Sequence, residues 1–167
     1  MEEKISLKHT FSVLVANKPG VLTRVAGLFS RRGYNIDSLA VGTTIDPAVS
    51  RITLVVEGNE RILEQVSKQL NKLIEVKKVI DITDVDTVDR GLFLIKVNAE
   101  AKQRQEIISI ANIFRAQVVD VGEKSMILEV TGNEEKVDAI QRLLNRYGII
   151  EMVRTGKVVL LRGEKKT

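Results

Sequence analysis

The chain has 167 residues, of which 44% are hydrophobic and 29% charged, and its formal net charge is +4. This balance is typical of a globular protein, and the length allows one ordinary domain or two small ones. The sequence contains no cysteine, which excludes disulfides, thiolate metal ligands and cysteine nucleophiles. Neither a bilayer-spanning apolar run nor a secretory signal is present, so we expect a cytoplasmic protein that does not bind membranes.

The first half of the sequence predicts the element order βαββαβ. Residues 10–16 alternate between apolar and polar side chains, as a strand does. Apolar residues from Val21 to Phe29 recur at helical spacing, with Pro19 suited to the first turn of that helix and Gly33 to its end. The other expected elements are a strand at about 35–45, a turn at 46–48, a strand carrying Ile52, Leu54 and Val56, a helix capped by Asn59 that carries Leu63, Val66, Leu70 and Leu73 inward, and a strand at 76–83.

The second half repeats this order. The match is literal in places, because Gly58-Asn59-Glu60 corresponds to Gly132-Asn133-Glu134, and Leu70-Asn71-Lys72 to Leu144-Asn145-Arg146 at the same spacing. The expected elements are strands at 92–97, 117–121 and 126–131, a helix marked by Ile107, Ile108, Ala111 and Phe114, a helix capped by Asn133 and stopped by Gly148, and closing apolar stretches at 149–153 and 158–161.

The repeat predicts an α+β protein of tandem ferredoxin-like βαββαβ domains, each an antiparallel sheet with helices on one face. We place the first domain at 8–84, an aspartate-rich linker at 85–89 and the second domain at 90–163. Such small units leave a sheet face and strand edges in need of cover, with Val41 and Val55 among the less protected positions. We therefore expect an oligomer, at least a dimer.

The sequence offers no credible catalytic or metal-binding set. His9 is the only histidine, and its place beside Lys8 at the start of a strand predicts a surface side chain rather than a general base. A histidine ligand pair cannot exist, and neither the dinucleotide-binding nor the phosphate-binding glycine motif is present. We therefore expect no catalytic residues, no metal and a binding function.

Two other classes of protein with the βαββαβ order fit less well. RNA-binding domains of this topology need aromatic side chains on the central strands, whereas residues 51–57 contain none and the basic residues are dispersed. We therefore expect no nucleic acid as partner. An acylphosphatase-like enzyme would need an arginine in the first loop, where this chain has Lys18 followed by Pro19.

The most informative segment is the loop Asn17-Lys18-Pro19-Gly20-Val21-Leu22, between the first strand and the first helix. A helix N-terminus presents free backbone N–H groups that bind a carboxylate. Gly20 lets a ligand approach the backbone, and the Asn17 side chain can meet an ammonium or a carboxylate. The loop therefore suits a free amino acid. From spacing alone, a tight strand–helix turn with Asn17 as N-cap remains the alternative.

These residues resemble the signature of ACT domains, which are amino-acid-sensing modules. The longer run from Gly20 to Leu39 is similar to the small subunit of acetolactate synthase (acetohydroxyacid synthase), and the resemblance extends over nearly the whole chain. Further matching stretches are Asp46-Pro47, Ser50-Arg51, Glu64-Gln65 through Lys68-Gln69-Leu70, and Phe114-Arg115-Ala116.

The resemblance implies a non-catalytic regulatory subunit. It implies a large catalytic subunit as partner, which carries thiamine diphosphate, Mg²⁺ and FAD and condenses pyruvate into acetolactate. This chain would raise that activity and confer feedback inhibition by valine or another branched-chain amino acid. It also implies a homodimer formed through the ACT domain, with each effector site between two protomers. Asn17, Gly20, Val21 and Leu22 would come from one chain, and Asn35 and Ile36 from the other.

Two points qualify this family pattern. Ala40 stands where some relatives carry a hydroxyl residue, and the second domain has Asn98-Ala99-Glu100-Ala101 where the glycine loop would be. We therefore assign no amino-acid site to the second domain and expect it to contact another subunit or its own copy. The main competing hypothesis is a free-standing amino-acid sensor that regulates a different biosynthetic enzyme.

Overall fold

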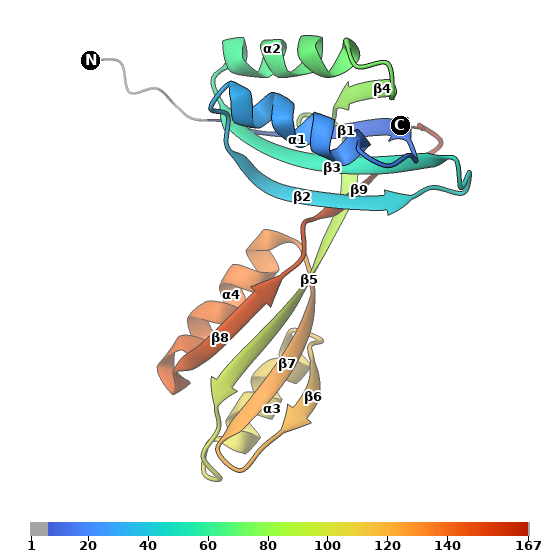
Figure 1. The fold of residues 1–167 in the computed structure, drawn as a ribbon. Coiled ribbons are helices and arrows are strands. Elements are labelled where there is room, and N and C mark those ends of the chain that lie inside the picture. The colour runs from blue at the N-terminus through green and yellow to red at the C-terminus, as the bar shows by residue number, and fades with distance from the viewer. Residues whose placement is uncertain (1–6, 167) are drawn as a thin grey trace. The chain divides into compact units, whose positions relative to one another are not determined.

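The computed structural model describes residues 7–166, which form two antiparallel sheets with helices packed on them (Figure 1). The chain divides into two compact units. The first unit is discontinuous: it comprises the chain up to Val88 and the segment that begins at Val158. The second unit is Asp89–Lys157. None of the helices in the described part of the chain is long and apolar enough to cross a membrane.

The first unit has the predicted order βαββαβ, and its sheet has the strand order β2-β3-β1-β4. All three strand pairs are antiparallel. The α+β fold predicted from the sequence is therefore confirmed for this unit. The elements are β1 (Leu7–Ala16), α1 (Val21–Arg31), β2 (Ile36–Thr43), β3 (Val49–Gly58), α2 (Glu60–Asn71) and β4 (Val76–Asp81).

The core of the first unit lies between the sheet and the two helices. Phe11, Val13 and Val15 alternate along β1, are at most 2% exposed, and pack with the buried faces of α1 and α2. Gly33 ends α1 in a left-handed conformation (φ 67°), which lets the backbone N–H of Tyr34 donate to the carbonyl of Phe29 at 3.1 Å. This stop leads the chain directly into β2.

The opposite face of the same sheet is better covered than the sequence suggests. Val41 is 47% exposed, as expected for edge strand β2, but Val55 on the inner strand β3 is only 3% exposed, so its predicted exposure is wrong. The first unit also includes β9 (Val158–Leu161), whose Val159 is 5% exposed. In Figure 1, β9 lies on the side of the sheet away from α1 and α2. A segment so distant in sequence cannot be foreseen from local periodicity.

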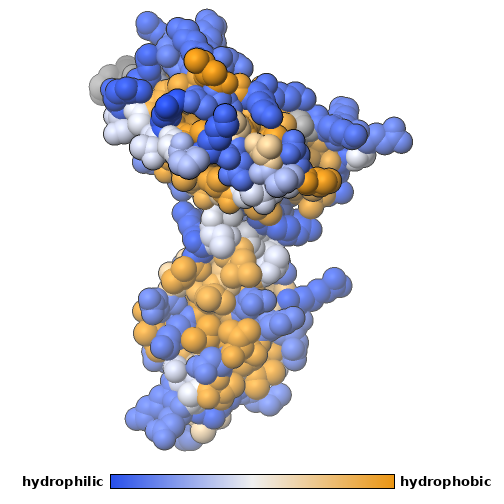
Figure 2. Space-filling view, turned by 45° about the vertical axis from the view of Figure 1, so that its right-hand side comes forward, coloured by the Kyte–Doolittle hydropathy of each residue, from blue (hydrophilic) through white to orange (hydrophobic). Residues whose placement is uncertain are grey.

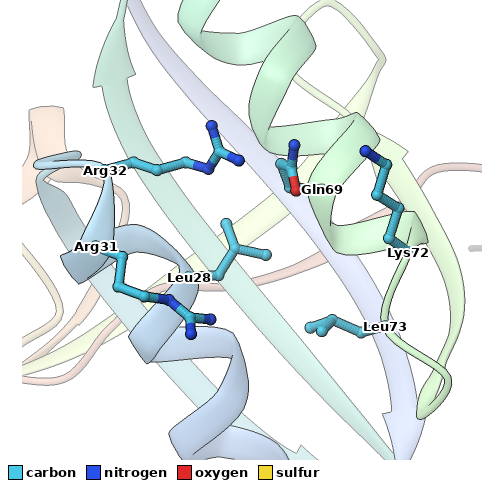
Figure 3. Close-up of a pocket in the computed structure, with 6 residues that line it drawn as sticks. All are labelled: Leu28, Arg31, Arg32, Gln69, Lys72 and Leu73. Carbon is cyan, nitrogen blue, oxygen red and sulfur yellow. The ribbon is translucent and has the colours of Figure 1, made fainter.

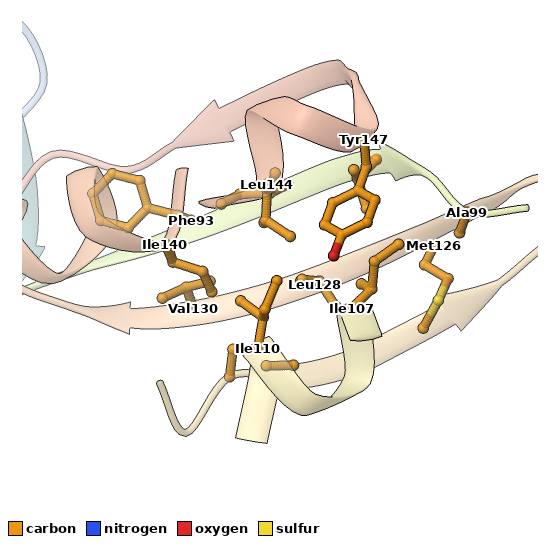
Figure 4. Close-up of a cluster of buried hydrophobic side chains, with 14 of the residues drawn as sticks. Phe93, Ala99, Ile107, Ile110, Met126, Leu128, Val130, Ile140, Leu144 and Tyr147 are labelled. Carbon is orange, nitrogen blue, oxygen red and sulfur yellow. The ribbon is translucent and has the colours of Figure 1, made fainter. Parts of the chain in front are cut away.

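The second unit has the same topology, with the strand order β6-β7-β5-β8, and β9 pairs additionally with β5. Its core lies between this sheet and its two α-helices, and Figure 4 shows Leu128, Ile140 and Tyr147 within it. The elements are β5 (Thr87–Asn98), α3 (Arg104–Ile113), β6 (Gln117–Val121), β7 (Ser125–Gly132), α4 (Glu134–Leu144), a 3₁₀ turn (Asn145–Tyr147) and β8 (Ile149–Arg154).

The segment between the units is more regular than its aspartates suggest. The composition predicts a linker at 85–89, but Thr87 already begins β5. Arg162 contributes to this order, because its backbone N–H donates to the carbonyl of Asp86 at 3.0 Å and its Nε lies 3.1 Å from Asp86 Oδ1. Residues 158–163, assigned from sequence to the second domain, therefore pack as part of the first unit.

The repeated Gly-Asn-Glu sequence forms the same strand-to-helix junction twice. The Oδ1 atom of Asn59 accepts from the N–H of Ile62 at 3.0 Å, and that of Asn133 accepts from Lys136 at 3.1 Å. A Cβ on the preceding Gly58 would lie 2.8 Å from Ile62 Cγ2, and glycine therefore leaves room for the first helical turn to pack over the strand end. Both predicted N-caps are confirmed.

We expect Asn59→Ala and Asn133→Ala each to lower the free energy of unfolding by about 1 kcal/mol, because each leaves a helix N–H without its side-chain acceptor. Asn112→Ala, at an exposed position of α3, is the control and should change stability by less than about 0.5 kcal/mol. Chemical denaturation of the three variants measures these changes. Equal stability of the cap variants and the Asn112→Ala control would contradict the prediction.

Candidate functional site

The glycine loop forms a sharp junction at which α1 begins. Gly20 is the N-cap residue of the helix, with φ 83° and ψ −10°, and it makes no side-chain cap. Pro19 therefore precedes the helix instead of lying in its first turn, and the alternative of Asn17 as N-cap is wrong. A Cβ on Gly20 would have no heavy atom within 4 Å, so glycine is needed there for its backbone angle, not for space.

Asn17 anchors the loop to the turn between β2 and β3. Its backbone N–H donates to the carbonyl of Ala48 at 2.8 Å, and its Nδ2 donates to the carbonyl of Pro47 at 2.9 Å. The turn is itself held by Asp46, whose Oδ1 accepts from the N–H of Ala48 at 2.9 Å. This anchoring role was missed from sequence, although the Asp-Pro turn was its visible signal. The Oδ1 atom of Asn17 takes no part in these hydrogen bonds.

The first turn of α1 offers backbone donors to a ligand. The first helical hydrogen bond runs from the N–H of Arg24 to the carbonyl of Gly20 at 3.0 Å, and the N–H of Val21 makes a long bond of 3.4 Å to Lys18. Among residues 7–166, the N–H groups of Leu22 and Thr23 have no protein acceptor. They point along the positive end of the helix dipole, where an anionic group is favoured.

The side chains of Val21 and Leu22 go to different places. Val21 is 5% exposed and packs in the core of the first unit, so only its backbone can face a ligand. Leu22 is 42% exposed, and its apolar side chain lies on the solvent side of the helix. The loop therefore combines free N–H donors, an amide oxygen and one exposed apolar side chain.

Asn35 and Ile36 lie at the other end of the same sheet. Ala16, beside the glycine loop, pairs with Val49, whereas Ile36 pairs with Val56. Seven residues along β3 separate these positions, or roughly 23 Å at the usual rise of a strand. Asn35 is exposed, and Ile36 packs partly against the core. One protomer therefore brings four of the six predicted residues together and holds the other two far away.

Arg24 beside the loop and His9 at the opposite end of β1 both have charged partners. Arg24, in the first turn of α1, forms an ion pair with Glu75 just before β4. His9 is half-buried rather than on the surface, and its Nδ1 lies 2.8 Å from Asp81 Oδ2. The pKa of the Asp81 carboxyl is lowered overall: burial raises it, but hydrogen bonds from Thr83 and His9 outweigh that effect. His9 thus has a structural partner and takes no part in the loop.

The equivalent junction of the second unit is built differently. Its Arg104 begins α3 and directs its guanidinium to backbone carbonyls of Ala99, Gly122 and Glu123. Ala99 is fully buried at the place where the first unit has its open loop. The helix start is therefore tied to the turn between β6 and β7. Within the described chain, no group of three or more His, Asp or Glu side chains is arranged to hold a metal.

Both units match models of one protein family. Residues 11–78 match the small subunit-like ACT domain of AHAS, and residues 90–163 match the small subunit of acetolactate synthase. A probable acetolactate synthase small subunit of Archaeoglobus fulgidus is 58% identical over 160 residues, which cover 96% of this chain and all of that protein. An acetolactate synthase small subunit of Mycobacterium bovis is 52% identical, with 94% of each chain covered.

A solved structure agrees with these sequence relatives. The crystal structure of the acetolactate synthase small subunit from Thermotoga maritima superposes with a TM-score of 0.86 and is 41% identical. The match covers 95% of this chain and 99% of that one. The relationship therefore extends through both units and through the segment that joins them.

Two glycines of α1 allow a test of the loop geometry. Gly20→Ala should destabilise the protein by about 1 kcal/mol, because alanine is strained at φ 83°. Gly27→Ala, in the interior of α1 with no heavy atom within 4 Å of the added Cβ, should stabilise it by about 0.5–1 kcal/mol. Thermal and urea unfolding of both variants measure these opposite changes in stability. A Gly20→Ala variant more stable than the wild type would contradict the left-handed conformation of Gly20.

Proposed function

We propose a regulatory function for this chain, which belongs to the family of acetolactate synthase small subunits. In this proposal it raises the activity of the large catalytic subunit and lets a branched-chain amino acid, valine first among them, inhibit the holoenzyme. The observation that carries the proposal is the match of both units to that family over nearly the whole chain. The chain itself performs no chemistry on pyruvate.

The glycine loop has the groups that recognise a free amino acid. The N–H groups of Leu22 and Thr23 suit the ligand carboxylate, and the helix dipole adds roughly 0.3–1 kcal/mol to its binding. Because Nδ2 of Asn17 already donates to Pro47, its Oδ1 is the atom left to accept from the ligand ammonium. The exposed Leu22 suits an apolar side chain.

A second copy of the chain completes the site. Strand β2 is an edge strand that pairs only with β3 among residues 7–166, and it exposes Leu39 by 37% and Val41 by 47%. Apolar side chains reach the surface of both units in Figure 2. Exposed apolar edges of this kind favour pairing with another strand.

Antiparallel pairing of β2 with its copy places the two half-sites together. The end of β2 lies beside the glycine loop, since Thr43 pairs with Ser50 and Val49 pairs with Ala16. The start of the partner's β2 would meet this end, which brings Asn35 and Ile36 of the partner protomer to the loop. The roughly 23 Å separation within one chain then becomes a short distance across the dimer.

The proposal gives the chemistry to the partner. Thiamine diphosphate, Mg²⁺ and FAD belong to the large subunit, which makes acetolactate, and this chain acts by binding. A free-standing sensor for another enzyme would bind the same amino acid through the same loop. Purification of the native complex distinguishes them, because only the proposed function recovers a thiamine-diphosphate enzyme.

Gly20→Asp is expected to give an active holoenzyme that resists valine. The aspartate carboxylate would lie at the N-terminus of α1, where it would repel the ligand carboxylate and accept from the helix N–H groups that the ligand needs. The positive φ also costs about 1 kcal/mol of stability. Valine titration of reconstituted holoenzyme should show inhibition weakened at least roughly tenfold, a loss of about 1.4 kcal/mol or more of effector binding.

Gly163→Asp is the matched control, because Gly163 also has a positive φ (71°) and open space but lies outside the loop. It should leave valine inhibition unchanged. Full valine sensitivity of a folded Gly20→Asp variant would show that the effector binds elsewhere.

Val41→Asp should weaken both the dimer and valine binding, because the pairing of β2 with its copy would bury a carboxylate from each chain in an apolar interface. We expect the dimer dissociation constant, measured by sedimentation, to rise roughly tenfold or more. Val119→Asp changes an equally exposed valine on edge strand β6 and should have no such effect on valine binding. A Val41→Asp protein that dimerises and binds valine normally contradicts the pairing.

A further inference from the structure

A cationic groove lies between the C-terminal halves of the antiparallel helices α1 and α2, on the first unit. It encloses about 420 Å³ and is lined by Leu28, Arg31, Arg32, Gln69, Lys72 and Leu73. Figure 3 shows Arg31 and Arg32 extending from the end of α1 toward α2, where Gln69 and Lys72 stand, with Leu28 between the helices. None of these residues belongs to the effector loop.

The charges of this groove are not balanced within the described chain. In the described chain, no carboxylate lies within ion-pair distance of Arg31, Arg32 or Lys72. By contrast, two other basic side chains of these helices are paired, Arg24 with Glu75 and Lys68 with Glu64. Helix α1 contains no acidic residue, and the acidic residues of α2 are confined to its first half. The groove therefore presents three positive charges to solvent.

Helix capping does not account for these side chains. The carbonyls at the end of α1 already accept from the backbone N–H groups of Arg32, Gly33 and Tyr34, and those of α2 accept from the N–H groups of Lys72 and Leu73. Cations near a helix C-terminus are favoured by its dipole, but that effect requires neither a groove nor an apolar floor.

The apolar part of the surface favours a polypeptide over a small anion as occupant. Leu28 is 5% exposed at the base of the groove, and Leu73 is half-buried on its wall. The next residue along the chain after Leu73, Ile74, is 98% exposed. A small polyanion would use the charges and leave Ile74 in water, whereas a protein segment with acidic and apolar side chains would use both.

We infer that this groove docks an acidic segment of the catalytic subunit, with apolar side chains of that segment packed on Leu28, Leu73 and Ile74. The inference rests on the proposed function. The turn at Gly33 follows the groove directly and leads into Asn35 and Ile36, the proposed half-site for the effector. Docking and effector binding would therefore share the segment 31–36.

The test compares a charge-reversed groove with a matched control. The variant is Arg31→Glu with Arg32→Glu, and the control is Lys102→Glu with Lys124→Glu, which makes the same charge change at exposed positions of the second unit. Binding of each full-length chain to the immobilised catalytic subunit is measured at several salt concentrations. Arg31→Gln with Arg32→Gln is a milder variant, and thermal melts and valine calorimetry show that each protein is folded.

The groove variant should bind the catalytic subunit at least roughly tenfold more weakly and with less salt dependence, while the control changes affinity by less than about twofold. An Ile74→Ala variant should also bind more weakly. Unchanged binding by a folded groove variant, beside normal activation by the wild type, overturns the inference and leaves the proposed function intact. The inference is also overturned if the groove variant binds the catalytic subunit normally but no longer binds pyrophosphate in calorimetry. That result would assign the groove to a small anion. Failure of the wild type to bind or activate overturns both.

Discussion

The antiparallel register of the first sheet governs where each recognition group can act. Because Ala16 pairs with Val49 while Ile36 pairs with Val56, the glycine loop and the start of β2 lie at opposite ends of one sheet. No side-chain movement can bridge seven residues of strand. A site that uses both ends must therefore be shared between two copies. In the described part of the chain β2 is an edge strand, and an edge strand can pair with a strand of another copy.

The two units show how one topology is kept while the junction before the first helix of each unit differs. The Gly-Asn junctions before α2 and α4 are nearly identical, because any helix leaving the end of an inner strand needs a cap and a clear first turn. The junctions before α1 and α3 differ. Gly20 leaves the helix start open, whereas Arg104 ties it to carbonyls of the next turn. The difference lies in the loops, where function can vary without disturbing the core.

Local signals predicted most of the fold, and long-range packing accounts for what they missed. Helix periodicity and the cap of Asn59 depend on neighbours within a few residues, so they could be read directly from the sequence. The order at Thr87 depends on Arg162, more than 70 residues away, whose Nε donates to the Thr87 carbonyl, and the burial of Val55 was not visible in the local pattern. The site shows the same division. The open start of α1 was visible in the glycine motif, whereas the attachment of Asn17 to Pro47 required the fold.

Helix α1 connects the two surfaces that regulation would require. Its N-terminus at Gly20 carries the free N–H donors, and its C-terminus carries Arg31 and Arg32. Both ends have a fixed conformation, set by the left-handed residues Gly20 and Gly33. Four buried side chains hold the helix between them against the sheet. A rigid helix moves as one body, so in the proposed function a shift caused by a bound effector at one end would appear at the other. The proposed inhibition would then require no local unfolding, only a change in how α1 rests on its sheet.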